Sequence, residues 1–279
     1  MRRLSTIFAT VLMLAAAVAL VVAQTAPPNA AGISMGHIHL VVPDPEAMQK
    51  TWVDVMGGTP MTAGPLTMVK LKNVFIIITK TPDNAPPREG TDGSAVNHVG
   101  FSVKSYVATR AKAEKAGLAV RELTAGQQAF VTFPHNVTVE IQEDPAIEGE
   151  SEFSHFHLSA PDPNAAREWY IKTFGGEEGQ RRKGVKGAKI PGGFVDILGT
   201  AGRGATTPGP APAPTKGRTL DHIGFEVKDL KAFTDQLTAN GQKLDVPLTD
   251  ATARLGLKIA FTTDPNGTYI ELTQGLNAK

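Results

Sequence analysis

The sequence predicts an α+β protein built from four copies of a strand–helix–strand module. Three observations support this prediction. A 22-residue segment that begins at His37 recurs 118 residues later at His155, with nine identical positions. A second segment, Asn97–Lys104, resembles Asp221–Lys228. All four segments read as a short strand followed by a turn and a helix, so the repeat defines the architecture.

The first 23 residues are expected to be a secretory signal. Two arginines precede an apolar run over residues 7–22, and small residues form a cleavage pattern just before Gln24. We therefore expect an exported protein, periplasmic or secreted, with a linker over residues 24–35. The alternative is an uncleaved membrane anchor, for which the apolar run is short.

Composition argues against several classes of protein. Without the signal, 26 basic and 27 acidic residues remain, and no basic run occurs, so nucleic acid is not an expected partner. The chain has no cysteine, which excludes lipoprotein attachment and a disulfide framework. No membrane partner is expected after signal cleavage. Stability must come from packing and from any bound metal.

The helices of the four modules have clear boundary signals. Asp44 and Asp162 are N-caps followed by proline, and paired glycines after residues 56 and 174 end the helices. Ser105 and Asp229 are the expected caps in the other two modules. Each module should close with a hairpin, as the Pro-Asn-Gly turn within residues 260–273 indicates. The expected modules are residues 36–80, 96–143, 152–199 and 219–275.

Histidines recur on one face of the first strands. Side chains alternate along a strand, so Ile38 and Leu40 lie on the apolar face while His37 and His39 point the other way. Glu140 and Glu271 occupy the matching face of the last strands. Two histidines and a carboxylate form a facial triad that suits Fe²⁺, Mn²⁺ or Zn²⁺ and leaves coordination positions open for substrate.

This pattern resembles the vicinal-oxygen-chelate superfamily, which includes glyoxalases, extradiol dioxygenases, fosfomycin-resistance enzymes and bleomycin-binding proteins. The resemblance covers residues 36–144 and 152–275, and Gly256–Thr273 resembles the last hairpin of glyoxalase-type members. It implies four βαβββ modules paired into two cup-shaped mixed sheets, with one domain over residues 36–144 and the other over 152–276. It implies metal ligands at His37, His98 and Glu140 in the first domain, and at His155, His222 and Glu271 in the second.

Some positions depart from the family pattern. The fourth glyoxalase ligand position holds Ile77 in the first domain and Asp196 in the second. Ring-opening dioxygenases add a histidine and a tyrosine, whereas the tyrosine position here reads Thr262 and no histidine lies between His157 and His222. These departures disfavour catechol cleavage by the usual route. Glyoxalase I needs glutathione, which an exported enzyme would not reliably meet.

The expected function is that of an exported, divalent-metal-dependent enzyme. Its small substrate would chelate the metal through two adjacent oxygens, with Glu271 or Asp196 as catalytic base and His39 and His157 lining the pocket. The sequence does not decide between isomerase or lyase chemistry and dioxygenase chemistry. The alternative is a non-catalytic drug- or metabolite-binding protein of the bleomycin-resistance type. The tandem halves mimic a dimer, so a monomer is expected.

Overall fold

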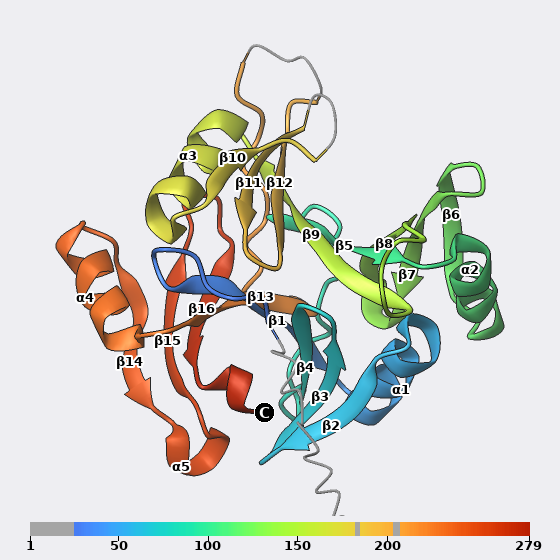
Figure 1. Ribbon diagram of the computed structural model, residues 1–279, viewed down its shortest axis with the longest axis horizontal. Helices are drawn as coiled ribbons and strands as arrows, with labels where there is room; N and C mark the ends of the chain where they lie inside the picture. Colours follow the sequence, from blue (N-terminus) through green and yellow to red (C-terminus); the bar gives the residue numbers. More distant parts are fainter. Residues whose placement is uncertain (1–24, 182–184, 203–206) are drawn as a thin grey trace, which may run out of the picture.

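The computed structural model describes residues 25–181, 185–202 and 207–279, so the expected signal over residues 1–23 lies outside the described part. The described residues form two eight-stranded mixed sheets with helices on their outer faces (Figure 1). Within these residues, no helix combines the length and apolar character needed to cross a membrane. The α+β fold with four strand–helix–strand modules is confirmed.

Sheet A has the strand order β14-β15-β16-β13-β1-β4-β3-β2. Its strands come from the first and fourth modules: β1 (Ile33–Val42), β2 (Thr59–Ala63), β3 (Leu66–Leu71), β4 (Val74–Lys80), β13 (Leu220–Val227), β14 (Leu244–Asp250), β15 (Lys258–Thr263) and β16 (Tyr269–Gln274). The two modules join where β1 pairs antiparallel with β13.

Sheet B has the strand order β10-β11-β12-β9-β5-β8-β7-β6. Its strands come from the second and third modules: β5 (Val96–Val103), β6 (Ala119–Thr124), β7 (Gln128–Phe133), β8 (Val137–Glu143), β9 (Ser151–Ala160), β10 (Glu177–Gly179), β11 (Lys186–Ile190) and β12 (Gly193–Gly199). Here the modules join through the antiparallel pair of β5 and β9.

The helices begin and end at the residues that the sequence indicates. Asp44 and Asp162 accept backbone N–H groups at the starts of α1 and α3, and left-handed Gly57 and Gly175 follow their ends. Ser105 and Asp229 cap α2 and α4 in the same way. The helices are α1 (Pro45–Met56), α2 (Tyr106–Lys115), α3 (Pro163–Phe174), α4 (Leu230–Ala239) and the short α5 (Thr252–Leu255), with 3₁₀ turns η1 (Pro134–Asn136) and η2 (Leu276–Ala278).

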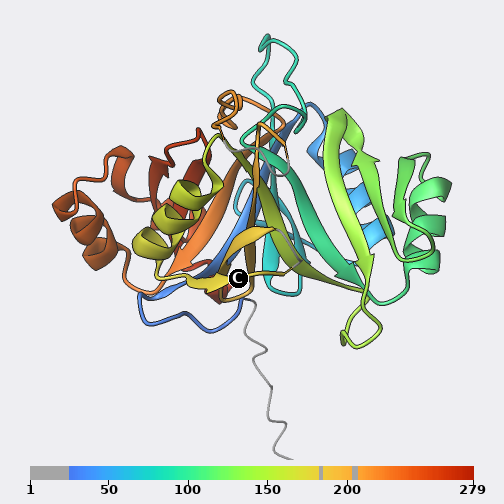
Figure 2. The ribbon, with the colours of Figure 1, turned by 90° about the horizontal axis from the view of Figure 1, so that it is seen from above.

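Aromatic side chains of the helices join the two modules of each half within the main core. Trp52 of α1 is fully buried against Phe101 and Phe133 of the second module. Phe174 of α3 contacts Phe233 of α4. Figure 2 shows the consequence, with α1 and α2 at one end of the molecule and α3 and α4 at the other. The halves therefore meet in the sheets and separate at the helices.

The expected pairing of modules is wrong. We expected residues 36–144 and 152–276 to form one cup-shaped sheet each, but each sheet takes one module from each half. The connections give the physical reason. Only residues 144–150 link β8 to β9, whereas residues 81–95 link β4 to β5 and residues 200–219 link β12 to β13. The shortest connection joins the second and third modules, which leaves the first to pair with the fourth.

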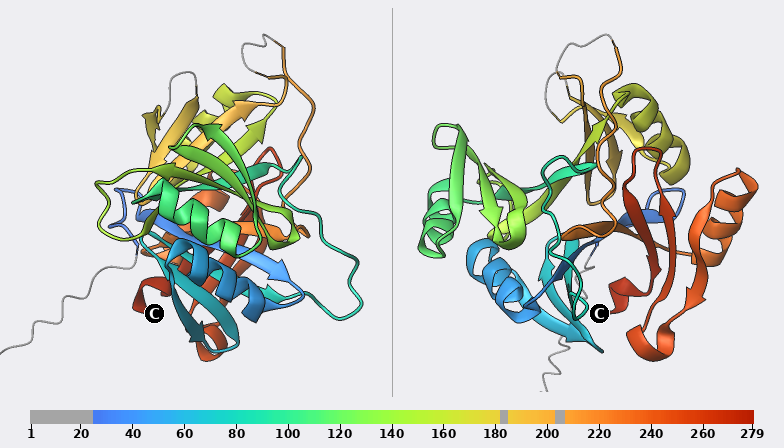
Figure 3. Two further views of the ribbon diagram at one scale, coloured as in Figure 1. Left: turned by 90° about the vertical axis from the view of Figure 1, so that its right-hand side faces the viewer. Right: turned by 180° about the vertical axis from the view of Figure 1, so that it is seen from behind.

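The C-terminal residues close one end of sheet A. Figures 1 and 3 show η2 between the strands β2–β4 and the strands β14–β16. Leu276 is fully buried in a small apolar cluster with Phe75 and Met68. Glu226 of β13 fixes this turn, since its Oε1 accepts the backbone N–H groups of Gly275 (2.9 Å) and Leu276 (3.1 Å). Burial raises the pKa of the Glu226 carboxyl despite these hydrogen bonds.

The raised pKa of Glu226 makes stability depend on pH. A carboxyl whose folded pKa exceeds its unfolded value contributes stability below the unfolded pKa and loses it as pH rises through the folded pKa. Glu226→Gln should therefore gain stability relative to wild type as pH rises from 4 to 8. Thermal unfolding across this range measures the difference, with exposed Glu168→Gln as surface control. A difference that shrinks with rising pH would contradict the prediction.

Engineered disulfides test the module pairing, because the chain has no cysteine of its own. Directly opposed antiparallel residues have Cα atoms about 4.5–5.5 Å apart, within the range for a disulfide. Ser102 opposes Glu152, and Ser34 opposes Glu226. We expect Ser102→Cys/Glu152→Cys and Ser34→Cys/Glu226→Cys to cross-link, as seen by non-reducing electrophoresis. Ser34→Cys/Ser102→Cys is the control, and it would cross-link only if modules paired within each half.

Candidate functional site

Sheet A gathers three histidines and a glutamate into one cluster, named site A. Its members are His37 and His39 of β1, His222 of β13 and Glu271 of β16, and one potential ligand atom from each lies within 4.8 Å of all the others. Strand register explains this meeting, because His39 stands opposite His222 while Gly224 stands opposite His37 and beside Glu271. Three strands thus aim their side chains at one point.

Glu271 is the centre of site A. Its Oε2 accepts hydrogen bonds from His37 Nε2 at 2.9 Å and from His222 Nε2 at 3.0 Å. Burial alone would raise the pKa of the Glu271 carboxyl, but the hydrogen bonds from His222 and His37 outweigh burial and hold this pKa well below its usual range. Glu271 is therefore a carboxylate, and both histidines turn Nε2 toward it.

Asp221 orients His222 from the opposite side of the ring. Its Oδ1 accepts a hydrogen bond from His222 Nδ1 at 2.9 Å, while its Oδ2 pairs with Arg88 Nη1 at 3.0 Å. Burial would raise the pKa of Asp221, but the hydrogen bond from His222 lowers it to about 2. A carboxylate that fixes the outer nitrogen of a histidine is the usual support of a metal ligand.

The other two histidines of site A favour the neutral form. Burial lowers the pKa of His37 even though Glu271 opposes this effect. Burial, followed by the neighbouring His222, lowers the pKa of His39 well below its usual value. His39 Nε2 lies 2.9 Å from Thr79 Oγ1, and no described residue makes a hydrogen bond to its buried Nδ1. Neutral imidazoles are the form that binds metal ions.

These donors fit a divalent metal ion. Two ligands that are each about 2.1 Å from an ion and at right angles to each other lie about 3 Å apart. The separations of Glu271 Oε2 from His37 Nε2 and His222 Nε2, 2.9 and 3.0 Å, match this spacing.

The remaining wall of this cup is apolar and aromatic. Ile77 stands beside His39 at the fourth ligand position and is 2% exposed, so site A has no carboxylate there. Tyr269 projects from β16 on the same face as Glu271, and its ring centroid lies 5.8 Å from that of His222. Burial raises the pKa of the Tyr269 hydroxyl to about 12, so it stays protonated at neutral pH.

Sheet B holds a related but different cluster, named site B. It contains His98 of β5, His155 and His157 of β9, Glu140 of β8 and Asp196 of β12. The three histidines offer nitrogens within 4.8 Å of one another. His98 Nε2 lies 3.3 Å from Glu140 Oε2, and His155 Nε2 lies 3.9 Å from Glu140 Oε1. Asp196 stands beside His157 in the register, at the position that Ile77 occupies in site A.

Arg181 reaches into site B. Both Nε and Nη2 lie 2.8 Å from Asp196 Oδ2, and Nη2 lies 3.1 Å from His155 Nε2. The same Nη2 lies 3.8 Å from Glu140 Oε1. A guanidinium thus stands among the ligand candidates of site B, whereas Arg88 stands outside site A and pairs with Asp221.

The structure regroups the predicted ligands. We expected His155 to join His222 and Glu271, and His37 to join His98 and Glu140. His37 instead joins His222 and Glu271, while His155 joins His98 and Glu140. The residues share faces as alternation along strands indicates, but the cups unite opposite halves of the chain.

Other expected roles change with this regrouping. The two proposed catalytic bases, Glu271 and Asp196, lie in different cups rather than in one. His39 lies in site A and His157 lies beside site B's His98, with ring centroids 4.6 Å apart. Site A therefore contains both an additional histidine and a tyrosine, Tyr269. Thr262 faces away from the cup, since its hydroxyl donates to the Lys243 carbonyl oxygen.

Sequence reasoning missed Asp221, Arg88 and Arg181. The acidic residue directly before His222 is a readable signal, because Asn97 holds the equivalent place before His98 and also hydrogen-bonds its histidine. Arg88 lies in a Pro-rich connection and Arg181 lies 15 residues from Asp196, so neither has a local pattern that would mark it.

A glycine on the neighbouring strand stands opposite His37 in site A and opposite His155 in site B. A Cβ at Gly224 would lie 1.9 Å from His37 Cε1, and a Cβ at Gly100 would lie 1.8 Å from His155 Cε1. The histidine ring lies flat over the neighbouring strand, where only glycine leaves room. This explains why His-x-Gly recurs at residues 98–100 and 222–224.

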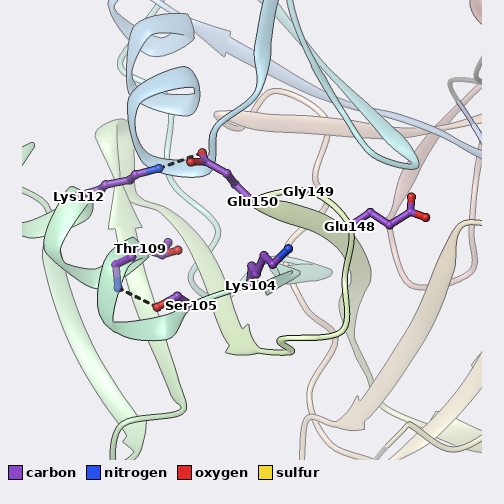
Figure 4. Close-up of a pocket in the computed structure, with 8 residues that line it drawn as sticks. Lys104, Ser105, Thr109, Lys112, Glu148, Gly149 and Glu150 are labelled. Atoms are coloured by element: carbon purple, nitrogen blue, oxygen red, sulfur yellow. Dashed lines mark hydrogen bonds and ion pairs between the residues drawn. The ribbon is translucent and has the colours of Figure 1, made fainter.

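A surface hollow of about 400 Å³ lies elsewhere, between α2 and residues 148–150 (Figure 4). Its lining includes Lys112, which pairs with Glu150 at 2.9 Å, and no histidine of either site. Exposed charged side chains without convergent buried groups make this hollow a poor candidate for chemistry.

Comparisons with known proteins agree with this geometry. The family model for the Glyoxalase/Bleomycin resistance protein/Dioxygenase superfamily matches residues 152–272. Glyoxalase I from Zea mays has a similar fold, with TM-score 0.67 and 14% identity, over 88% of this chain and 94% of that one. A putative dioxygenase from Bacillus subtilis subsp. subtilis str. 168 has TM-score 0.64 and 14% identity, over 87% and 86%. A comparison with curated proteins found no match.

The paired βαβββ modules place histidines and a carboxylate inside each cup, and the cluster in sheet A is a candidate metal site. The match to the glyoxalase/bleomycin resistance/dioxygenase superfamily, also called the vicinal-oxygen-chelate superfamily, covers residues 152–272, which hold the third and fourth modules. The fold of the described residues as a whole is glyoxalase I-like.

Gly224→Ala should disrupt site A by displacing His37. We expect metal binding at site A to weaken by about 100-fold, since a misplaced or unsupported ligand costs one to two orders of magnitude. Gly100→Ala is the matched control, because it displaces His155 and leaves site A intact. Metal titration monitored by mass spectrometry measures both, with circular dichroism as a check of folding. Equal losses in the two variants would contradict this account.

Proposed function

We propose that site A is the metal centre of a divalent-metal-dependent enzyme. Its small substrate would bind through two adjacent oxygens. The observation that carries this proposal is the convergence of His37, His222 and Glu271 from three strands, with Asp221 orienting His222 behind them. Burial of a carboxylate costs free energy, so a carboxylate buried beside neutral imidazoles and an ion-paired aspartate indicates a functional site rather than a purely structural core. The bound metal would act as a Lewis acid toward the substrate oxygens.

The surrounding residues supply the remaining functions. His39 is neutral, and with Nε2 hydrogen-bonded to Thr79 its Nδ1 can accept a proton. Tyr269 keeps its proton and can donate a hydrogen bond to a substrate oxygen. Ile77, Met68 and Phe75 form an apolar wall that excludes water from one side. The metal ligands are thus surrounded by a base, a hydrogen-bond donor and an apolar surface.

The number of ligands favours dioxygenase chemistry over glyoxalase chemistry. We assign His37, His222 and Glu271 as the ligands, because His39 Nε2 is engaged by Thr79 Oγ1. Ile77 provides no ligand at the remaining position, which leaves a facial triad with open positions for substrate and a second small molecule. His39 and Tyr269 further favour this choice, because ring-opening dioxygenases of the resembled family use a histidine and a tyrosine for proton transfer. Isomerase or lyase chemistry remains the second candidate, with Glu271 as the base.

The rival class is a non-catalytic protein that sequesters a drug or metabolite. Bleomycin-binding members of the resembled family do without the metal ligands, so the ligand set of site A favours the enzyme. We also propose export, on the basis of the signal-like first 23 residues. Fractionation of the native producer, with N-terminal sequencing of the mature chain, tests export independently of activity.

Metal content of the purified protein tests the proposed function. We expect about one equivalent of Fe, Mn or Zn per chain, lost in Glu271→Ala and retained in Glu140→Ala, which changes the equivalent carboxylate of site B. Asp221→Asn should weaken binding by about 10- to 100-fold without removing a ligand. The metal-loaded protein is then assayed with catechols and with α-hydroxycarbonyl compounds, following oxygen uptake in the first case.

Absence of metal after reconstitution would overturn the enzyme proposal and leave the sequestering protein. Metal with turnover of α-hydroxycarbonyl compounds and no oxygen uptake would replace the dioxygenase assignment with the lyase one. His39→Ala serves as the proton-transfer variant, and it should reduce turnover while leaving metal content unchanged.

A further inference from the structure

Sites A and B differ by a linked pair of residues. The repeat offset of 118 residues places Arg181 at the position of Ala63. Ala63 is the last residue of β2, and Arg181 lies two residues after the end of β10. The strand register places Asp196 at the position of Ile77. Site A thus has two apolar residues, both buried, where site B has an arginine and an aspartate. At these two positions, site B therefore carries one positive and one negative charge, and site A carries none.

One nitrogen of Arg181 stands where the donors of site B converge. Nη2 lies 2.8 Å from Asp196 Oδ2 and 3.1 Å from His155 Nε2. It also lies 3.8 Å from Glu140 Oε1, while Nη1 donates to Gln142 Oε1 at 3.3 Å. The atoms that hold the guanidinium are therefore the atoms that a metal ion would need.

We infer that Arg181 is the built-in cation of site B and excludes a metal ion from it. The guanidinium cannot lose its proton, so its charge is permanent. A divalent ion at the same donors would meet that charge at close range in a buried site, where repulsion is poorly screened. Asp196 and Glu140, fully and almost fully buried, gain their counter-charge from Arg181 instead.

This arrangement gives the chain one metal centre despite two cups. Site A has Ala63 in place of the arginine, and the guanidinium of Arg88 pairs with Asp221 behind His222. The prediction that site A holds the single ion rests on the proposed function. The prediction that Arg181 closes site B does not, because removal of Arg181 should open site B whatever site A does.

Counting bound Co²⁺ tests the inference, since Co²⁺ reports both stoichiometry and coordination through its absorption spectrum. We expect about one Co²⁺ per wild-type chain, removed by Glu271→Ala. Arg181→Met should bind a second Co²⁺, which His98→Ala removes in the Arg181→Met background. Arg167→Met is the matched control, because Arg167 pairs with Glu178 on the surface of the same module and should not change the count.

A second variant guards against unfolding of Arg181→Met. Arg181→Ala/Asp196→Ile introduces the apolar pair of site A and removes the buried aspartate together with the arginine. It should also bind two Co²⁺, with His98, His155 and Glu140 as the ligands of the second. Circular dichroism and thermal unfolding confirm that each variant is folded before the count is interpreted.

The outcomes separate the two proposals. Folded arginine variants that bind no more Co²⁺ than wild type would overturn the inference and leave the proposed function standing. Wild-type Co²⁺ that is lost in His98→Ala would also overturn it, because site B would then be open. A wild type without Co²⁺, together with an Arg181→Met variant that binds one ion sensitive to His98→Ala, would support the inference and overturn the proposed function.

Discussion

The antiparallel pairing of the first strands, β1 with β13 and β5 with β9, is the constraint on which both sites depend. Each site takes histidines from two modules, and this pairing brings those histidines side by side. It places His37 and His39 against His222, and it requires glycine opposite the leading histidine. Each sheet takes one module from each half of the chain, so neither half could form a complete cup without the other.

Electrostatics then separates two sites built on one scaffold. In site A the carboxylate of Glu271 is balanced by hydrogen bonds from two histidines, and a second ion pair, Arg88 with Asp221, supports His222 from behind. In site B a permanent cation enters the cup itself. A buried carboxylate needs a partner, and the two cups meet this requirement in different ways.

The duplicated architecture places both sites over one apolar core. The two sheets have no strand in common but pack on one buried core, so a sheet whose site holds no metal still contributes buried surface to the whole. The C-terminal turn adds to the asymmetry, because Leu276 and the apolar residues around Phe75 fill part of the cup of sheet A. The differences between sites A and B are therefore concentrated in a few side chains on the inner faces of the two sheets.

The sequence alone determined the modules, their helix boundaries and the faces of their strands, because capping residues, paired glycines and period-two alternation act over short stretches of chain. It identified His37, His98, His155, His222, Glu140 and Glu271 as residues of the inner faces. Only the tertiary structure decided which of them meet. The four first strands carry nearly the same pattern, so β1 could pair with β5 or β13 in the same register, and the short connection between β8 and β9 selected one arrangement. The contacts of Arg181 with Asp196 and His155 are likewise tertiary, and no local sequence pattern indicates them.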